Sequence, residues 1–100
     1  MNKIDLSQHD IDAVIKILRT HLPKPDYEIY FFGSRVNGTS TKKSDLDVLI
    51  KGKAPAPLER IALVNEVLEN SELTFNVDIL DYYVCDPVTA KRFLQGAIRI

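Results

Sequence analysis

The sequence has 100 residues, of which 45% are hydrophobic, and its 13 basic and 14 acidic residues give a formal charge of −1. This length allows one domain, residues 1–100, and the composition excludes a disordered chain and the broad basic surface of a non-specific nucleic-acid binder. The single cysteine excludes an intrachain disulfide and a cysteine cluster for zinc. A charge within residues 1–6 and the lack of a long apolar run predict a cytoplasmic protein, neither exported nor inserted in a membrane.

The chain begins with a predicted helix and a predicted strand. Ser7 with Asp10 three positions later resembles a capping box, and apolar residues then recur at helical spacing as far as Pro23. The aromatic and β-branched run 28–32 predicts a buried strand, which Gly33 ends. A turn is therefore expected directly after this strand.

The middle of the chain predicts a polar loop, a strand and a second helix. Residues 34–44 are polar, and residues 45–50 predict a strand whose polar residues come first. After a connector rich in Pro and Ala, an apolar stripe at helical spacing is expected to face the core: Leu58, Ile61, Ala62, Val64 and Leu68.

The last third predicts a strand and a helix. Residues 73–83 are a strand candidate, and Asp86-Pro87 is suited to cap and begin a final helix. The order of elements predicts an α/β (α+β) domain, with a small mixed sheet flanked by helices.

Acidic residues on two predicted strands are the candidates for chemistry. Asp45 and Asp47 are two positions apart, so in a strand both carboxylates point to the same face, where a hard cation such as Mg²⁺ offsets their repulsion. Asp78 lies among apolar residues and completes a three-carboxylate cluster if its strand is adjacent, whereas Asp81 projects to the other face. Solvated acids at a strand end are the alternative for a lone DxD pair, and exposure on an edge strand is the alternative for Asp78.

The loop after the first strand is a candidate phosphate site. Gly33 permits a close approach, and Ser34 offers a hydroxyl beyond the strand end. Arg35, Lys42 and Lys43 add positive charge to the same loop. For Arg35 a phosphate contact and a surface ion pair remain equally open, and the two lysines also fit an ordinary solvated loop.

One family has this combination of residues. Gly33-Ser34, ten intervening residues and Asp45-Leu46-Asp47 resemble the GS-x10-DxD signature of the nucleotidyltransferase superfamily related to DNA polymerase β. Together with Ser44 and the segment 77–80, the chain looks most like the minimal, MNT-type members. The resemblance implies that Asp45, Asp47 and Asp78 are catalytic metal ligands, and that Gly33, Ser34, Arg35 and Ser44 bind the nucleotide.

The resemblance also implies an activity and a partner. The activity is transfer of a nucleoside monophosphate, AMP from ATP, to a hydroxyl of a protein or RNA acceptor, with two Mg²⁺ ions. The partner is a HEPN-domain protein encoded by an adjacent gene, for which such proteins serve as antitoxin. The alternative is a non-catalytic module that neutralises this partner by docking alone.

Apolar residues near the end of the sequence have two interpretations. They are Phe93, Leu94, Ala97, Ile98 and Ile100. They form either an interface with a partner or a second copy, giving a homodimer, or the end of the monomer core, as a last helix and an edge strand.

Overall fold

The computed structural model describes residues 4–100. The first half of the segment 1–6, on which the cytoplasmic prediction rests in part, therefore lies outside the described residues. Its elements are α1 (Gln8–His21), β1 (Glu28–Phe32), α2 (Ser34–Asn37), β2 (Leu46–Lys51), α3 (Leu58–Glu69), β3 (Val77–Asp81), α4 (Pro87–Leu94) and β4 (Ile98–Arg99). The predicted fold class is confirmed. The short helix α2 was not predicted and lies in the segment expected to be loop.

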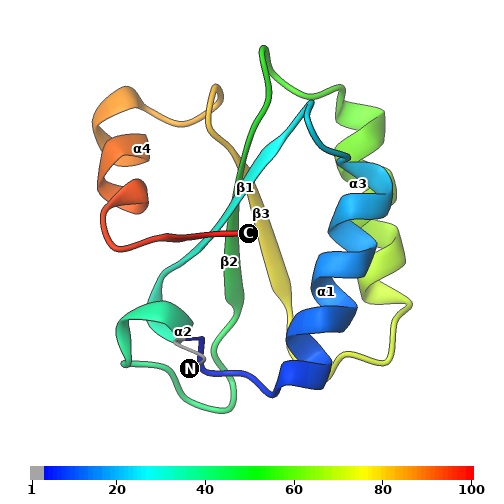
Figure 1. The fold of residues 1–100 in the computed structure, drawn as a ribbon, viewed down its shortest axis with the longest axis vertical. Coiled ribbons are helices and arrows are strands. Elements are labelled where there is room, and N and C mark those ends of the chain that lie inside the picture. Colours follow the sequence, from blue (N-terminus) through cyan, green and yellow to red (C-terminus); the bar gives the residue numbers. More distant parts are fainter. Residues whose placement is uncertain (1–3) are drawn as a thin grey trace.

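The four strands form one mixed sheet in the order β3-β2-β1-β4. β1 is antiparallel to both β2 and β4, whereas β2 and β3 are parallel. A parallel pair needs a crossover connection, and α3 supplies it. Figure 1 shows α1 and α3 on one side of the sheet and α4 on the other.

The main hydrophobic core lies between the sheet and the two helices α1 and α3. Alternate residues of β2 belong to it and are fully buried, because side chains alternate between the two faces of a strand: Leu46, Val48 and Ile50. Leu18 of α1 and Val64 of α3 pack in the same cluster. The odd-numbered positions of β2 therefore face the side of the sheet that carries α4.

The expected apolar stripe of α3 is only partly correct. Val64 and Leu68 are buried and Ile61 packs against the core, but Ala62 is exposed and Leu58 is 83% exposed. Leu58 continues the helical spacing, but it is the first residue of α3 and does not belong to the core cluster, which here includes Ala56 and is contacted by Ile61. Periodicity marks the face of a helix and does not show how far the neighbouring layer extends.

Two leucines of α3 offer a matched test of this packing. Leu68→Ala is expected to lower the free energy of unfolding by about 2–5 kcal/mol, because Leu68 is 7% exposed and its loss leaves a cavity. Leu58→Ala makes the same change in an exposed position and is expected to stay within about 0.5 kcal/mol of wild type. Urea unfolding followed by circular dichroism measures both, and equal losses would contradict the structure.

The helix caps predicted at the starts of the first and last helices are confirmed. Ser7 Oγ accepts a hydrogen bond from the Asp10 N–H (3.1 Å) and caps α1. The Asp86 carboxylate accepts hydrogen bonds from the N–H groups of Val88 (3.1 Å) and Thr89 (3.2 Å) at the start of α4. The third strand is shorter than the predicted range 73–83, beginning at Val77.

The apolar residues near the end of the sequence complete the monomer. The ring of Phe93 stacks on Phe32 with centroids 4.5 Å apart. Ile98 lies opposite Phe31 in the pairing of β4 with β1, and both Ile98 and Ile100 pack against the core. The packing of Phe93, Ile98 and Ile100 agrees with the second interpretation, and the homodimer stays a prediction. None of the helices in residues 4–100 combines the length and the apolar character needed to cross a membrane.

Candidate active site

The acidic candidates meet at one end of the β2–β3 pair. Asp47 and Asp78 are direct partners in the parallel register, so their side chains leave the sheet on the same face. Asp47 is half-buried and Asp78 is exposed. β2 begins at Leu46, one residue later than predicted, so Asp45 is an exposed loop residue immediately before the strand.

Asp47 has the perturbed carboxyl group of this site. Burial raises the pKa of Asp47, and the negative charges of Asp78 and Asp45 raise it further. Across residues 4–100, no group of three His, Cys, Asp or Glu side chains is placed so that it could hold a metal ion, so the predicted three-carboxylate cluster is not assembled in this structure. Mg²⁺ commonly takes one or two carboxylates and shares its remaining positions with water and substrate phosphates. The oxygen donors of Asp47 and Asp78 fit that use as a pair.

Asp81, the other acid on β3, has a structural role. Its carboxylate accepts hydrogen bonds from the N–H groups of Ala56 (2.8 Å) and Tyr83 (3.0 Å). These bonds tie the β2–α3 connector and the turn after β3 to the strand. The geometry therefore favours Asp78 over Asp81 as the acid of the site.

Gly33 lies directly against the carboxylate of Asp47. Its φ of 83° is in the range that favours glycine, and a Cβ atom at this position would lie 2.1 Å from Asp47 Oδ2 and 3.1 Å from Asp47 Cγ. The contact follows from the sheet, because Phe32 is the register partner of Asp47 across β1 and β2. Glycine is thus required here by both backbone and space.

The chain turns immediately after Gly33 into α2. The Gly33 carbonyl accepts hydrogen bonds from the N–H groups of Val36 (3.0 Å) and Asn37 (2.9 Å). The hydroxyl of Ser34 makes no hydrogen bond to any of residues 4–100. Gly38, with a φ of 86°, ends the helix.

Arg35 requires a correction. It is 7% exposed, which excludes the surface ion pair, and its guanidinium donates hydrogen bonds to the carbonyls of Ser44 (3.0 Å), Asp5 (2.7 Å) and Lys42 (3.3 Å). The guanidinium also lies over the ring of Phe75, 5.4 Å from its centroid. Because three backbone carbonyls engage the buried cation, Arg35 holds the loop in place, and we do not retain it as a nucleotide contact.

The rest of the loop is ordered by its own polar groups. Ser44 Oγ accepts a hydrogen bond from the Thr41 N–H (2.8 Å), so this hydroxyl is engaged within the loop. Lys42 and Lys43 are exposed, as a solvated loop requires. That Ser44 also binds the nucleotide stays a prediction.

A cavity of about 320 Å³ opens beside Gly33 and Asp47. It is lined by Phe32, Gly33, Val36, Asn37, Asp47, Arg92, Phe93, Gln95 and Gly96. The last four residues belong to the end of α4 and the turn after it, and no sequence pattern predicted that they line this cavity. Arg92 lies in the last turn of α4, where basic residues are common. Only the packing of α4 on the sheet brings Arg92 to this site.

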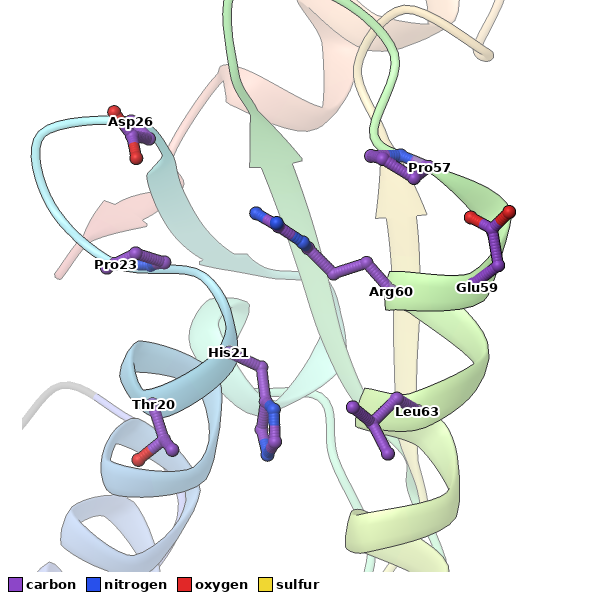
Figure 2. Close-up of a pocket in the computed structure, with 8 residues that line it drawn as sticks. All are labelled: Thr20, His21, Pro23, Asp26, Pro57, Glu59, Arg60 and Leu63. Atoms are coloured by element: carbon purple, nitrogen blue, oxygen red, sulfur yellow. The ribbon is translucent and has the colours of Figure 1, made fainter.

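A larger cavity of about 560 Å³ lies elsewhere, between the end of α1 and the start of α3. Figure 2 shows Arg60 extending from α3 toward the segment that precedes β1, whereas Glu59 points away from it. Arg60 donates a hydrogen bond to the Tyr27 hydroxyl (3.3 Å). This cavity adjoins the Glu28–Lys51 end of the β1–β2 pair, and Asp47 is at the other end, so it is separate from the acidic site.

A mixed sheet with paired carboxylates on neighbouring strands, facing a glycine turn, is the arrangement expected of a nucleotidyltransferase domain. Residues 8–99 match the family model for the nucleotidyltransferase domain, and the chain belongs to this family. Its reaction class is therefore nucleotidyl transfer.

Individual relatives agree with this assignment. The probable protein adenylyltransferase MntA of Haemophilus influenzae is 34% identical over 80 residues, which are 80% of this chain and 68% of that protein. A chain in the crystal structure of a toxin–antitoxin with AMP-PNP has a TM-score of 0.72 and 26% identity, covering 88% of this chain and 69% of that one. A chain in the toxin–antitoxin MntA-HpeT with two Asp-to-Glu substitutions has a TM-score of 0.68 and 22% identity, covering 94% and 71%, and shows the shared fold.

Proposed function

We propose that this nucleotidyltransferase transfers AMP from ATP to a hydroxyl group of a protein or RNA acceptor, with Mg²⁺. The observation that carries the proposal is the register pairing of Asp47 with Asp78 beside the Gly33 turn. AMP as the transferred group is supported by the relatives, one of them a probable protein adenylyltransferase and another solved with the ATP analogue AMP-PNP.

Each residue has a defined task in this reaction. Gly33 and Ser34 bind the triphosphate, Asp47 and Asp78 hold Mg²⁺ as a pair, and Asp45 adds negative charge beside Asp47. When bound, Mg²⁺ supplies the positive charge that stabilises the triphosphate and the departing pyrophosphate.

Asp78 stands on the acceptor side of the site. It is exposed and lies on β3, an edge strand of the sheet in residues 4–100, so an acceptor can approach it directly. Its carboxylate orients the attacking hydroxyl and takes up the hydroxyl proton. The hydroxyl oxygen forms a bond to the α-phosphorus, and the bond to the β-phosphate breaks, releasing pyrophosphate.

The acceptor that we propose is a HEPN-domain protein encoded by an adjacent gene, for which this chain is the antitoxin. The proposal is supported by the similar structure at 26% identity, which is that of a toxin–antitoxin with AMP-PNP.

Labelled ATP tests the transfer. The protein is incubated with its HEPN partner and Mg²⁺, in parallel with α-labelled and γ-labelled ATP. We expect label on the partner from α-labelled ATP alone, since the γ-phosphate leaves in pyrophosphate. Label from γ-labelled ATP would indicate a kinase instead. No transfer with any divalent ion, from protein whose circular dichroism shows it folded, would refute the enzymatic proposal.

A growth assay separates modification from docking. The partner is expressed with wild-type protein or with the double variant Asp45→Asn and Asp47→Asn. We expect the variant to bind the partner and yet fail to neutralise it. Full neutralisation by the double variant would mean that docking is sufficient and that the antitoxin effect needs no AMP transfer.

A further inference from the structure

The arginines of the chain differ in how they are used. Four of the five have partners for the guanidinium: Arg19, Arg35, Arg60 and Arg99. The fifth, Arg92, makes no hydrogen bond, ion pair or ring contact with its side chain to any of residues 4–100. Its charge is thus available to a ligand.

The position of Arg92 is set by its neighbour in the sequence. Phe93 stacks on Phe32 of β1, which fixes the last turn of α4 against the sheet. Arg92 consequently lines the cavity that also contains Gly33 and Asp47. The backbone is held by packing, while the side chain stays exposed and free to close on a ligand.

Among residues 4–100, Arg92 is also the single basic residue in the lining of this cavity. Arg35, the other arginine near the Gly33 turn, is committed to backbone carbonyls. A nucleoside triphosphate brings several negative charges into a site that already contains acidic groups. The planar fork of a guanidinium matches two phosphate oxygens at once, which an ammonium group cannot do.

We propose that Arg92 of α4 binds the triphosphate of the nucleotide and closes the open side of the cavity over Gly33. This inference rests on the proposed function, because it assumes that the nucleotide lies in this cavity. It adds a substrate-binding residue that lies far from the GS-x10-DxD segment in the sequence.

Binding of AMP-PNP with Mg²⁺ tests the proposal by titration calorimetry. Arg92→Gln is expected to weaken binding about 10- to 100-fold, since it removes charge-assisted hydrogen bonds. Arg92→Lys keeps the charge and is expected to restore part of the affinity. Lys91→Gln, on the same helix but outside the cavity lining, is the matched control and is expected to bind as wild type. Adenosine, which has no phosphate, is expected to bind Arg92→Gln and wild type equally.

The outcomes separate this inference from the proposed function. Equal affinity of Arg92→Gln and wild type for AMP-PNP would overturn the role of Arg92. An equal loss in Lys91→Gln would also overturn it, because the effect would then come from general charge. If AMP-PNP binding depends on Arg92 but no AMP reaches any acceptor, the inference stands and the proposed transfer fails.

Discussion

Asp47→Asn is expected to lower the rate of AMP transfer by about a hundredfold or more while the protein stays folded. The amide keeps the volume of the carboxylate but removes the negative charge that Mg²⁺ requires. Asp47 is the register partner of Asp78, and the negative charges of both Asp78 and Asp45 raise its pKa. The measurement is the initial rate of label transfer from α-labelled ATP at saturating Mg²⁺.

The stability of Asp47→Asn is expected to rise, although its rate of AMP transfer falls. The pKa of Asp47 is raised in the folded protein, so its ionised form costs free energy of folding. This cost is absent at a pH below the ordinary carboxyl pKa, where Asp47 is protonated in both the folded and the unfolded state. It grows as the pH rises from that ordinary pKa through the raised pKa of the folded protein. With EDTA present, Asp47→Asn is therefore expected to gain stability relative to wild type as the pH rises to neutrality, measured by urea unfolding.

Asp81→Asn is the matched control. The same substitution on β3 weakens the hydrogen bonds to the N–H groups of Ala56 and Tyr83, so stability is expected to fall while transfer continues. If Asp47→Asn transfers AMP as fast as wild type, the metal-ligand assignment is wrong. If Asp81→Asn loses transfer and keeps its stability, the wrong acid of β3 was chosen.

Much of the fold could be predicted because its signals are local. The run 28–32 is β1 to the residue, and Asp86-Pro87 caps and begins α4. The spacing from Gly33 to Asp47 indicated the site without knowledge of the sheet. The adjacency of Asp78 required only that its strand lie beside β2, and the parallel register places it opposite Asp47.

The errors involve contacts between distant segments. Arg35 looked like a loop cation, but one of its acceptors is the carbonyl of Asp5, and no local pattern indicates such a bond. Arg92 was not among the predicted site residues, because its place in the cavity depends on the stacking of Phe93 on Phe32. Tertiary packing decides which partners a charged side chain has. Sequence periodicity indicates only the helix or strand in which the residue lies.

Gly33→Ala is expected to reduce AMP transfer by about a hundredfold, because a shift of about 1 Å in a catalytic group can cost that much. The new methyl group would stand 2.1 Å from Asp47 Oδ2, so the carboxylate must rotate away from its position. The backbone of Gly33, with φ 83° and ψ −158°, lies in a region nearly restricted to glycine, and alanine there costs about 1–3 kcal/mol of stability.

Gly38→Ala separates the contact with Asp47 from backbone strain. Gly38 also has a positive φ, 86°, but a Cβ atom there meets nothing within 4 Å. We therefore expect Gly38→Ala to lose about 1–2 kcal/mol of stability while transfer stays near the wild-type rate. Transfer rates are compared at a temperature where both variants are folded by circular dichroism. If both variants lose activity alike, the effect comes from the α2 turn as a whole, and the close approach of Gly33 to Asp47 has no separate role in the reaction.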